Sequence, residues 1–263
     1  MTQISRRRFF IHSAHTTIGV AAGLAALQAD DPELALASAD DPSRSDKPLE
    51  LCLVSGSLEY RSDESLGAFQ EHLQKRYPVK CTRAFIRTES DLPGLENLDR
   101  CDCMLLFTRR LTISGEQLER VKRYCRRGGP IVAIRTASHA FQNWLELDKE
   151  VLGGDYRGHY GNKETPQIRI VAAAKDHPIL RGFEPYTSAG SLYKNPKIAA
   201  DTALLLTGTI PEHTEPVAWT RVHRGGRVFY TSLGHPEDFR QVGFLRLLAG
   251  AIFWTCRREP AAK

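Results

Sequence analysis

The sequence predicts an α/β fold with a mostly parallel central sheet and helices on both faces. Two observations lead to this prediction. Short apolar runs alternate with segments of helical periodicity through the first half of the chain, and brief turns rich in glycine and serine connect them. One run, residues 101–107, is apolar almost throughout, as expected for a strand buried on both faces. With 263 residues, 41% of them hydrophobic, the chain is long enough to bury such a core.

The individual elements follow from local patterns. The first helix is indicated by Leu66, Phe69 and Leu73, which recur at helical spacing. Ser114 and Gln117 have the spacing of a capping box, which predicts where the second helix begins. Strands are predicted at residues 49–54, 79–85, 101–107, 130–134, 167–172, 203–207, 216–222 and 227–232, and a closing helix at 241–256.

The N-terminal segment resembles an export signal. Residues 5–10 read Ser-Arg-Arg-Arg-Phe-Phe, similar to the twin-arginine motif, and small-residue cleavage signals follow. The apolar stretch at 18–27 is shorter than the ~20 residues that a membrane span needs. We therefore expect an exported protein, periplasmic or extracytoplasmic, with no membrane segment in the mature form. The expected organisation is a signal peptide at 1–39, a linker at 40–48, one domain at 49–257 and a tail at 258–263.

The net charge argues against a nucleic-acid partner, and the cysteine spacing argues against a zinc knuckle. The formal net charge is +5, and several of the positive residues lie in the first eight positions. The body of the chain is therefore nearly neutral, which argues against nucleic-acid binding. None of the six cysteines has Cys-x-x-Cys spacing, so a zinc knuckle is not expected and buried thiols are the simpler interpretation.

Candidate site residues follow the predicted strands. In an open parallel sheet, ligands bind beyond the carboxyl ends of the strands. If the sheet forms as predicted, the polar residues that follow four strands converge there. These are Glu59 and Tyr60; Thr108, Arg109 and Arg110; Arg135, Thr136, Ser138 and His139; and His235, Glu237 and Asp238.

Arg135 occupies the turn between a predicted strand and a helix that should begin near Ser138. Such a turn exposes one side chain at the end of the sheet, as in a nucleophile elbow. A guanidinium there would present a planar fork of donors to an anion or a sugar oxygen. The alternative is a capped helix in which Arg135 forms a salt bridge.

His235 is followed two residues later by Glu237, an arrangement in which the carboxylate can orient an imidazole base. The alternative is a surface turn built on Pro236. Together with His139 and His159, His235 could also offer three imidazoles to zinc. No short-range spacing supports that, so no metal ligand and no firm cofactor are predicted, and a divalent metal such as zinc stays open.

Several segments resemble the trehalose-utilisation (ThuA-like) family, and the resemblance covers residues 49–257. It implies a three-layer flavodoxin-like fold related to class I glutamine amidotransferases. Their His-x-Glu pair matches His235 and Glu237, but Arg135 stands where their catalytic cysteine would be. Glutamine hydrolysis is therefore not expected. The matching segments are 135–141, 153–154, 158–159, 176–179 with Gly182, 216–219 and 225–235.

The family is linked to the use of carbohydrates, including trehalose and keto sugars. The resemblance therefore implies a small-molecule carbohydrate partner, and family precedent makes a homodimer reasonable. Many members carry His at the elbow, and a metal has been associated with some; Arg135 departs from that pattern. The residues expected to bind substrate are Glu59, Tyr60, Thr136, Ser138, His159 and Tyr193.

Two functional hypotheses follow. The first is an enzyme that acts on a sugar or keto-sugar derivative by hydrolysis or by proton abstraction next to a carbonyl. His235 would be the base and Glu237 its orienting group, while Arg135 and His139 would stabilise developing negative charge. The second is a non-catalytic carbohydrate-binding protein on an amidotransferase-like scaffold.

Overall fold

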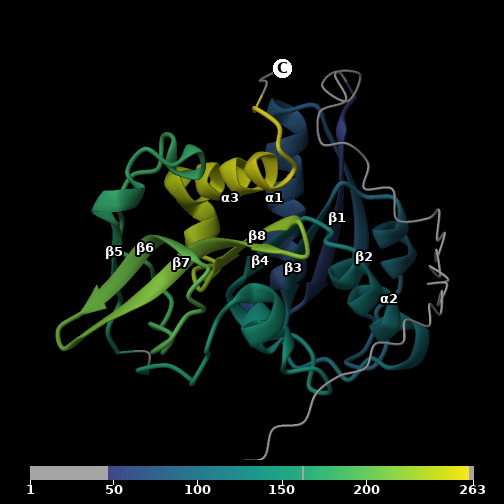
Figure 1. Ribbon diagram of the computed structural model, residues 1–263, viewed down its shortest axis with the longest axis horizontal. Coiled ribbons are helices and arrows are strands. Elements are labelled where there is room, and N and C mark those ends of the chain that lie inside the picture. The colour runs from purple at the N-terminus through teal and green to yellow at the C-terminus, as the bar shows by residue number, and fades with distance from the viewer. Residues whose placement is uncertain (1–46, 162, 261–263) are drawn as a thin grey trace, which may run out of the picture. The chain divides into compact units, whose positions relative to one another are not determined.

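The computed structural model describes residues 47–161 and 163–260, so the predicted signal peptide and most of the predicted linker lie outside the described residues. Its central feature is one eight-stranded sheet of order β2-β1-β3-β4-β8-β7-β6-β5 (Figure 1). The strands are β1 (Leu49–Gly56), β2 (Val79–Phe85), β3 (Cys103–Thr108), β4 (Ile131–Ile134), β5 (Gln167–Ile170), β6 (Ala203–Ile210), β7 (His213–His223) and β8 (Gly226–Thr231), and the α-helices are α1 (Ser62–Arg76), α2 (Gly115–Arg126) and α3 (Val242–Thr255).

The sheet has a parallel half and an antiparallel half. Strands β2, β1, β3, β4 and β8 are parallel, whereas β8, β7, β6 and β5 pair antiparallel. Figure 1 shows the parallel strands on the right and the antiparallel extension in green on the left. The prediction of an α/β fold with a mostly parallel sheet is confirmed.

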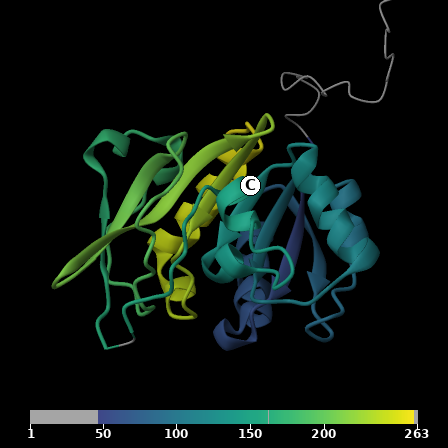
Figure 2. The ribbon, with the colours of Figure 1, turned by 60° about the horizontal axis from the view of Figure 1, so that its bottom comes forward.

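Alternating side chains bury both faces of the parallel half. Leu51 and Leu53 of β1 belong to one core cluster with residues of α1 and α3, whereas Cys52 and Val54 belong to a second cluster with residues of α2. Successive side chains of a strand point to opposite faces, so a fully apolar strand needs a cover on each side. Figure 2 shows α3, in yellow, lying against the sheet, where it contacts β4 and β8.

The pair Gly225-Gly226, between the strands predicted at 216–222 and 227–232, predicts a hairpin turn, and the observed turn between β7 and β8 lies one residue earlier. Its central residues are Arg224 and Gly225, with φ of 48° and 84°, and Gly226 already opens β8. Two consecutive left-handed residues are typical of a type I′ hairpin turn. The hairpin itself is confirmed.

The predicted capping box is wrong. Ser114 makes no side-chain cap at the start of α2. The side chain of Gln117 instead accepts a hydrogen bond from the amide of Leu92 (3.0 Å) and donates one to Asp91 (2.9 Å). The glutamine therefore fastens α2 to a neighbouring loop and does not satisfy the helix terminus.

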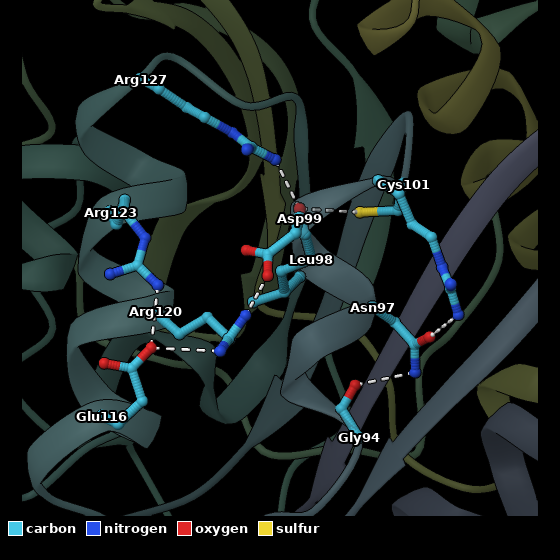
Figure 3. A network of polar contacts seen from close by, with 10 residues as sticks. Gly94, Asn97, Leu98, Asp99, Cys101, Glu116, Arg120, Arg123 and Arg127 are labelled. Carbon is cyan, nitrogen blue, oxygen red and sulfur yellow. Dashed lines mark hydrogen bonds and ion pairs between the residues drawn. The ribbon is translucent and has the colours of Figure 1, made fainter.

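A polar network fixes α2 against the short 3₁₀ helix η3 (Leu95–Asp99), as Figure 3 shows. Arg120 pairs with Asp99 and with Glu116 (3.1 Å), and Glu116 also pairs with Arg123 (3.0 Å). Most of these side chains are exposed, so each pair adds little stability by itself. The network positions the loop between β2 and β3.

The six cysteines are free thiols, and Cys52, Cys103 and Cys125 are buried. Burial raises the pKa of Cys125 to about 12, which keeps this thiol protonated and unreactive. Within the described part of the chain, no helix has the length and apolar character needed to cross a membrane.

Candidate functional site

The elbow after β4 is a strained turn. Arg135 begins the 3₁₀ helix η4 (Arg135–His139), which takes the place of the α-helix predicted to begin near Ser138. Its φ is 48°, in the left-handed region that costs a side-chain-bearing residue about 1 kcal/mol or more. The hydroxyl of Tyr230 donates to the Arg135 carbonyl (2.9 Å), so a strand of the sheet holds the turn from below.

The Arg135 guanidinium is buried, with 1% of the residue exposed. It lies between two tyrosine rings, 4.4 Å from the centroid of Tyr60 and 4.7 Å from that of Tyr193. It donates to the carbonyl of Ser232 (2.7 Å) and to the hydroxyls of Tyr60 (3.1 Å) and Ser191 (3.2 Å).

The guanidinium of Arg135 is therefore used in contacts inside the protein, and the predicted exposed donor fork is not formed. The alternative of a salt bridge is not formed either, because Arg135 pairs with no carboxylate among residues 47–161 and 163–260. Cation–π contacts and neutral acceptors stabilise the buried charge instead. The buried Arg135 side chain thus contacts Tyr60, Tyr193 and the end of β8 and holds them together.

His235 lies near the buried Arg135 side chain, since its ring contacts that of Tyr60 at a centroid distance of 6.3 Å. Its Nδ1 accepts a hydrogen bond from the backbone amide of Glu237 (3.3 Å), whereas the Glu237 carboxylate pairs with Arg240 (2.8 Å). The predicted contact between carboxylate and imidazole is thus replaced by an amide contact. A neutral imidazole that accepts at Nδ1 carries its proton on Nε2, so His235 presents a donor and not a base.

Asp238 holds the turn that carries His235. Its Oδ2 accepts from the amides of Gly234 (2.8 Å) and His235 (3.0 Å) and from the hydroxyl of Ser188 (3.0 Å). The aspartate is buried, with 1% exposure. This carboxylate performs the orienting task that the sequence suggested for Glu237, but it acts on the backbone of the turn.

His139 lines a cavity of about 540 Å³ at the carboxyl ends of the strands. Its ring stacks on Tyr156, with centroids 4.5 Å apart and planes inclined by 16°. The cavity is lined by Arg110, Ser138, His139, Leu145, Glu146, Asp148, Lys149, Asp155, Tyr156, Arg157 and Gly158.

A chain of hydrogen bonds sets the tautomer of His139. The hydroxyl of Ser138 donates to the Arg135 carbonyl (3.3 Å) and lies 3.0 Å from Nδ1 of His139. With the hydroxyl proton on the carbonyl, Nδ1 donates to Ser138 and Nε2 carries the lone pair. In this tautomer His139 is an acceptor at Nε2, the opposite of His235.

Two groups of the cavity have pKa values displaced in opposite directions. Burial, together with the charges of Arg110 and Arg109, lowers the pKa of His139 to about 3, so the imidazole is neutral at physiological pH. Burial raises the pKa of Asp148 to about 6, although the amide of Tyr156 donates to its Oδ2 (2.8 Å). The other oxygen, Oδ1, has no hydrogen-bond partner. Opposed shifts of this kind often separate the acid and the base of an active site.

Comparisons with known proteins show the family and the fold of this chain. A family model described as "Trehalose utilisation" (ThuA) matches residues 53–255. The chain belongs to the ThuA family. The predicted resemblance is confirmed, and a search of curated proteins finds no match.

Solved structures show the same fold for this ThuA-family chain. A ThuA-like protein from Parabacteroides merdae ATCC 43184 is 17% identical with a TM-score of 0.67, covering 82% of this chain and 93% of that one. One from Bacteroides uniformis ATCC 8492 is 16% identical with a TM-score of 0.62, covering 80% and 92%. A β-galactosidase from Bacillus circulans sp. alkalophilus is 14% identical with a TM-score of 0.54, covering 81% of this chain and 32% of that one.

The remaining predicted substrate residues of this ThuA-family chain are less well placed. Glu59 is exposed and pairs with Arg109 (2.7 Å), and Thr136 is buried and donates to Ser57 (3.0 Å). His159 is exposed, and its Nδ1 accepts from the amide two residues further on (3.1 Å). The structure thus brings Tyr60, Ser138 and Tyr193 to the elbow and leaves Glu59, Thr136 and His159 in other contacts.

The donor set at the elbow does not fit a metal ion. A guanidinium has no lone pair to offer, so Arg135 cannot be a ligand. Within the described residues, His139, His159 and His235 do not come together, and no group of three or more His, Cys, Asp or Glu side chains could hold a metal.

The sequence did not indicate one residue of the cavity, Asp148, or the role of another residue, Asp238. Asp148 lies in the mixed-charge run Leu-Asp-Lys-Glu, which is typical of a solvated helix face, so nothing in the sequence indicates its burial. Asp238 was grouped with Glu237, but the sequence does not tell which of two neighbouring carboxylates points inward. Only the turn geometry after β8 decides that.

Proposed function

We propose that this ThuA-family chain binds a sugar or keto-sugar derivative in the cavity beside His139. A volume of about 540 Å³ lies within the range of small-ligand sites. The lining offers donors, acceptors and the aromatic side chain of Tyr156, the combination that a sugar requires. The description of the family as trehalose utilisation supports a carbohydrate ligand.

The state of His139 is the observation that carries this proposal. Its Nε2 is an acceptor held in place by the contact of Nδ1 with Ser138 and by stacking on Tyr156. A sugar hydroxyl can donate to this nitrogen. Because the imidazole is neutral, binding does not require the desolvation of a charge.

We further propose that the bound sugar is converted, by hydrolysis or by removal of a proton next to a carbonyl group. In this step Asp148, which lines the same cavity as His139, takes up the proton. His139 accepts a hydrogen bond from the sugar and, with a pKa of about 3, does not act as the base. Asp148 can exchange a proton near neutral pH because its pKa is about 6. Arg135 supports the site through Tyr193, whose ring contacts those of His139 and Tyr156.

A second candidate function is favoured by the buried guanidinium. The elbow that carries the nucleophile in related hydrolases here carries Arg135, which is sealed between tyrosine rings. A scaffold without a nucleophile at this position suits a carbohydrate-binding protein that leaves its ligand unchanged. The two candidates share the binding site and differ only in whether a bond is broken.

Calorimetry against a panel of disaccharides and their keto forms tests the binding site, with mass spectrometry of the recovered ligand. His139→Phe keeps an aromatic ring beside Tyr156 but removes the acceptor, and we expect at least a tenfold loss of affinity. His213→Phe is the matched control, since His213 also stacks on a tyrosine (Tyr160, 4.0 Å) but does not line the cavity.

Recovery of an altered ligand would support the enzyme, and recovery of an unaltered one would support the binding protein. If the wild type and His139→Phe bind every sugar of the panel equally well, the cavity beside His139 is not the binding site. Both candidate functions would then be refuted.

Three further properties are part of the proposal. The twin-arginine-like residues 5–10 support export, which fractionation of cells that produce the full chain tests. Family precedent supports a homodimer, which light scattering tests. The packing of α1 and α3 on one face and α2 on the other supports a three-layer, flavodoxin-like fold related to class I glutamine amidotransferases.

A further inference from the structure

We propose that a second cavity, at the opposite end of the sheet, binds a phosphate group. It has a volume of about 620 Å³ and lies beside the start of β8 and the C-terminal end of α3. The strand-end site lies at the other end of β8, so the two sites are separate. The second cavity is lined by Tyr77, Pro178, Arg181, Gly182, Arg227, Arg246, Gly250, Phe253, Trp254, Arg257, Arg258, Glu259 and Pro260.

The lining is strongly cationic. It contains five arginines and a single carboxylate, that of Glu259, which pairs with Arg181 (3.2 Å). Three of the other guanidiniums bond to neutral backbone carbonyls: Arg227 to Trp254 (2.8 Å), Arg246 to Gly182 (3.3 Å) and Arg257 to Gly225 (3.3 Å). Those three form no ion pair with any residue that the structure describes, so their charges are not neutralised within the protein.

The arginines are held in place, and they repel one another. The guanidinium of Arg227 lies 4.7 Å from the ring centroid of Trp254, which fixes its plane. Burial and the charge of Arg257 together lower the pKa of Arg227. Repulsion between the arginines around the cavity destabilises the protein. An anion bound between them would relieve this repulsion.

The end of helix α3 does not oppose an anion here. The C-terminal carbonyls of a helix carry partial negative charge. The carbonyl of Trp254 already accepts hydrogen bonds from the side chain of Arg227 and from the amide of Arg257 (3.1 Å). The partial negative charge of this carbonyl is therefore already compensated by two donors.

The chemistry of phosphate matches this lining. Arginine forks form paired hydrogen bonds with phosphate oxygens, and a dianion balances more than one guanidinium at once. The volume suits a small molecule, and Tyr77 and Phe253 offer apolar surface to a carbon body next to the phosphate. Both free phosphate and a sugar phosphate have this chemistry.

The test is thermal unfolding and calorimetry of the full chain with inorganic phosphate, glucose 6-phosphate and glucose, each against potassium chloride of equal ionic strength. We expect both phosphates, and not glucose, to raise the Tm. Tighter binding of glucose 6-phosphate identifies an organic phosphate as the ligand, and equal binding identifies the free ion. Stabilisation by a short DNA duplex but by neither phosphate would overturn the proposal in favour of a polyanion surface.

Variants locate the site. Arg246→Gln changes an exposed side chain on α3 and should weaken phosphate binding at least fivefold without loss of fold. Arg227→Gln should act in the same direction. Arg123→Gln is the matched control, because Arg123 lies on α2 and pairs with Glu116 (Figure 3). Phosphate affinity that is unchanged in both Arg246→Gln and Arg227→Gln, or reduced equally in Arg123→Gln, would contradict the assignment.

Discussion

The neutral state of His139 should make the protein lose stability as the pH falls. In the folded chain the pKa of this imidazole is about 3, whereas an unfolded histidine titrates near 6.5. Between these values the unfolded chain binds a proton that the folded chain excludes. The contribution of His139 is therefore fully present above about pH 6.5 and is lost progressively as the pH falls toward 3.

The size of the loss follows from the difference in pH. A pH of 5 lies about 1.5 units below the pKa of the unfolded imidazole, whereas the folded imidazole is still neutral at that pH. At ~1.4 kcal/mol per unit, wild type should lose about 2 kcal/mol of unfolding free energy between pH 7 and pH 5 relative to a chain without this group. Asp148 shifts stability the other way in the same window, so a single pH titration of wild type would not isolate His139.

The assay is urea unfolding of the wild type and His139→Gln at pH 7 and pH 5. Glutamine keeps hydrogen-bonding capacity but does not titrate, and Asp148 is present in both proteins, so its contribution cancels. The difference in unfolding free energy, wild type minus variant, should fall by about 2 kcal/mol at the lower pH. A difference that stays constant between the two pH values would show that the folded imidazole is protonated normally, and the argument for an acceptor at Nε2 would fail.

Three other changes probe the same region by unfolding measurements. Asp148→Asn should stabilise the protein at pH 7, by up to ~3 kcal/mol, because it removes a buried charge. The gain in unfolding free energy should vanish near pH 4, where the carboxyl group is protonated. An equal gain at both pH values would contradict the raised pKa of about 6. Trp219→Phe removes the hydrogen bond from Nε1 to a buried carbonyl (2.8 Å) and should cost ~1–3 kcal/mol. Gly190→Ala would place a Cβ 2.7 Å from Nη1 of Arg135 and should lower the Tm by several degrees, whereas Gly67→Ala in α1, where the nearest atom is 3.9 Å away, should be neutral or stabilising.

The fold could be predicted from the sequence to the extent that it depends on local patterns. The apolar runs located β1, β3 and β4, since a strand buried on both faces leaves an almost unbroken hydrophobic pattern. The predicted strand at 79–85 has the bounds that the structure shows, and the helix at 241–256 differs by one residue at each end. The Ser114 capping box failed because Gln117 found partners in a loop that is distant in sequence, and local spacing carries no such information.

The site was predicted less well, because its chemistry depends on burial. Convergence of the strand ends followed from topology, and the contacts of Tyr60 with Arg135 and His235 agree with it. Exposure did not follow from topology. Arg135 was expected to face a ligand, but the packing of two tyrosine rings encloses it, and this packing depends on a tyrosine from a remote loop. The sequence also could not reveal which nitrogen of each histidine carries the proton, since the neighbouring hydrogen bonds decide that.

The left-handed backbone at position 135 has a conformational cost, and the contacts of the Arg135 side chain offset it. Two substitutions can separate these contributions. Arg135→Gly and Arg135→Ala both delete the guanidinium and its contacts with the tyrosines. Only alanine keeps the Cβ that makes a φ of 48° unfavourable, so glycine should be the more stable of the pair by about 1 kcal/mol. That difference is the conformational energy that the arginine side chain overcomes in holding the elbow in shape.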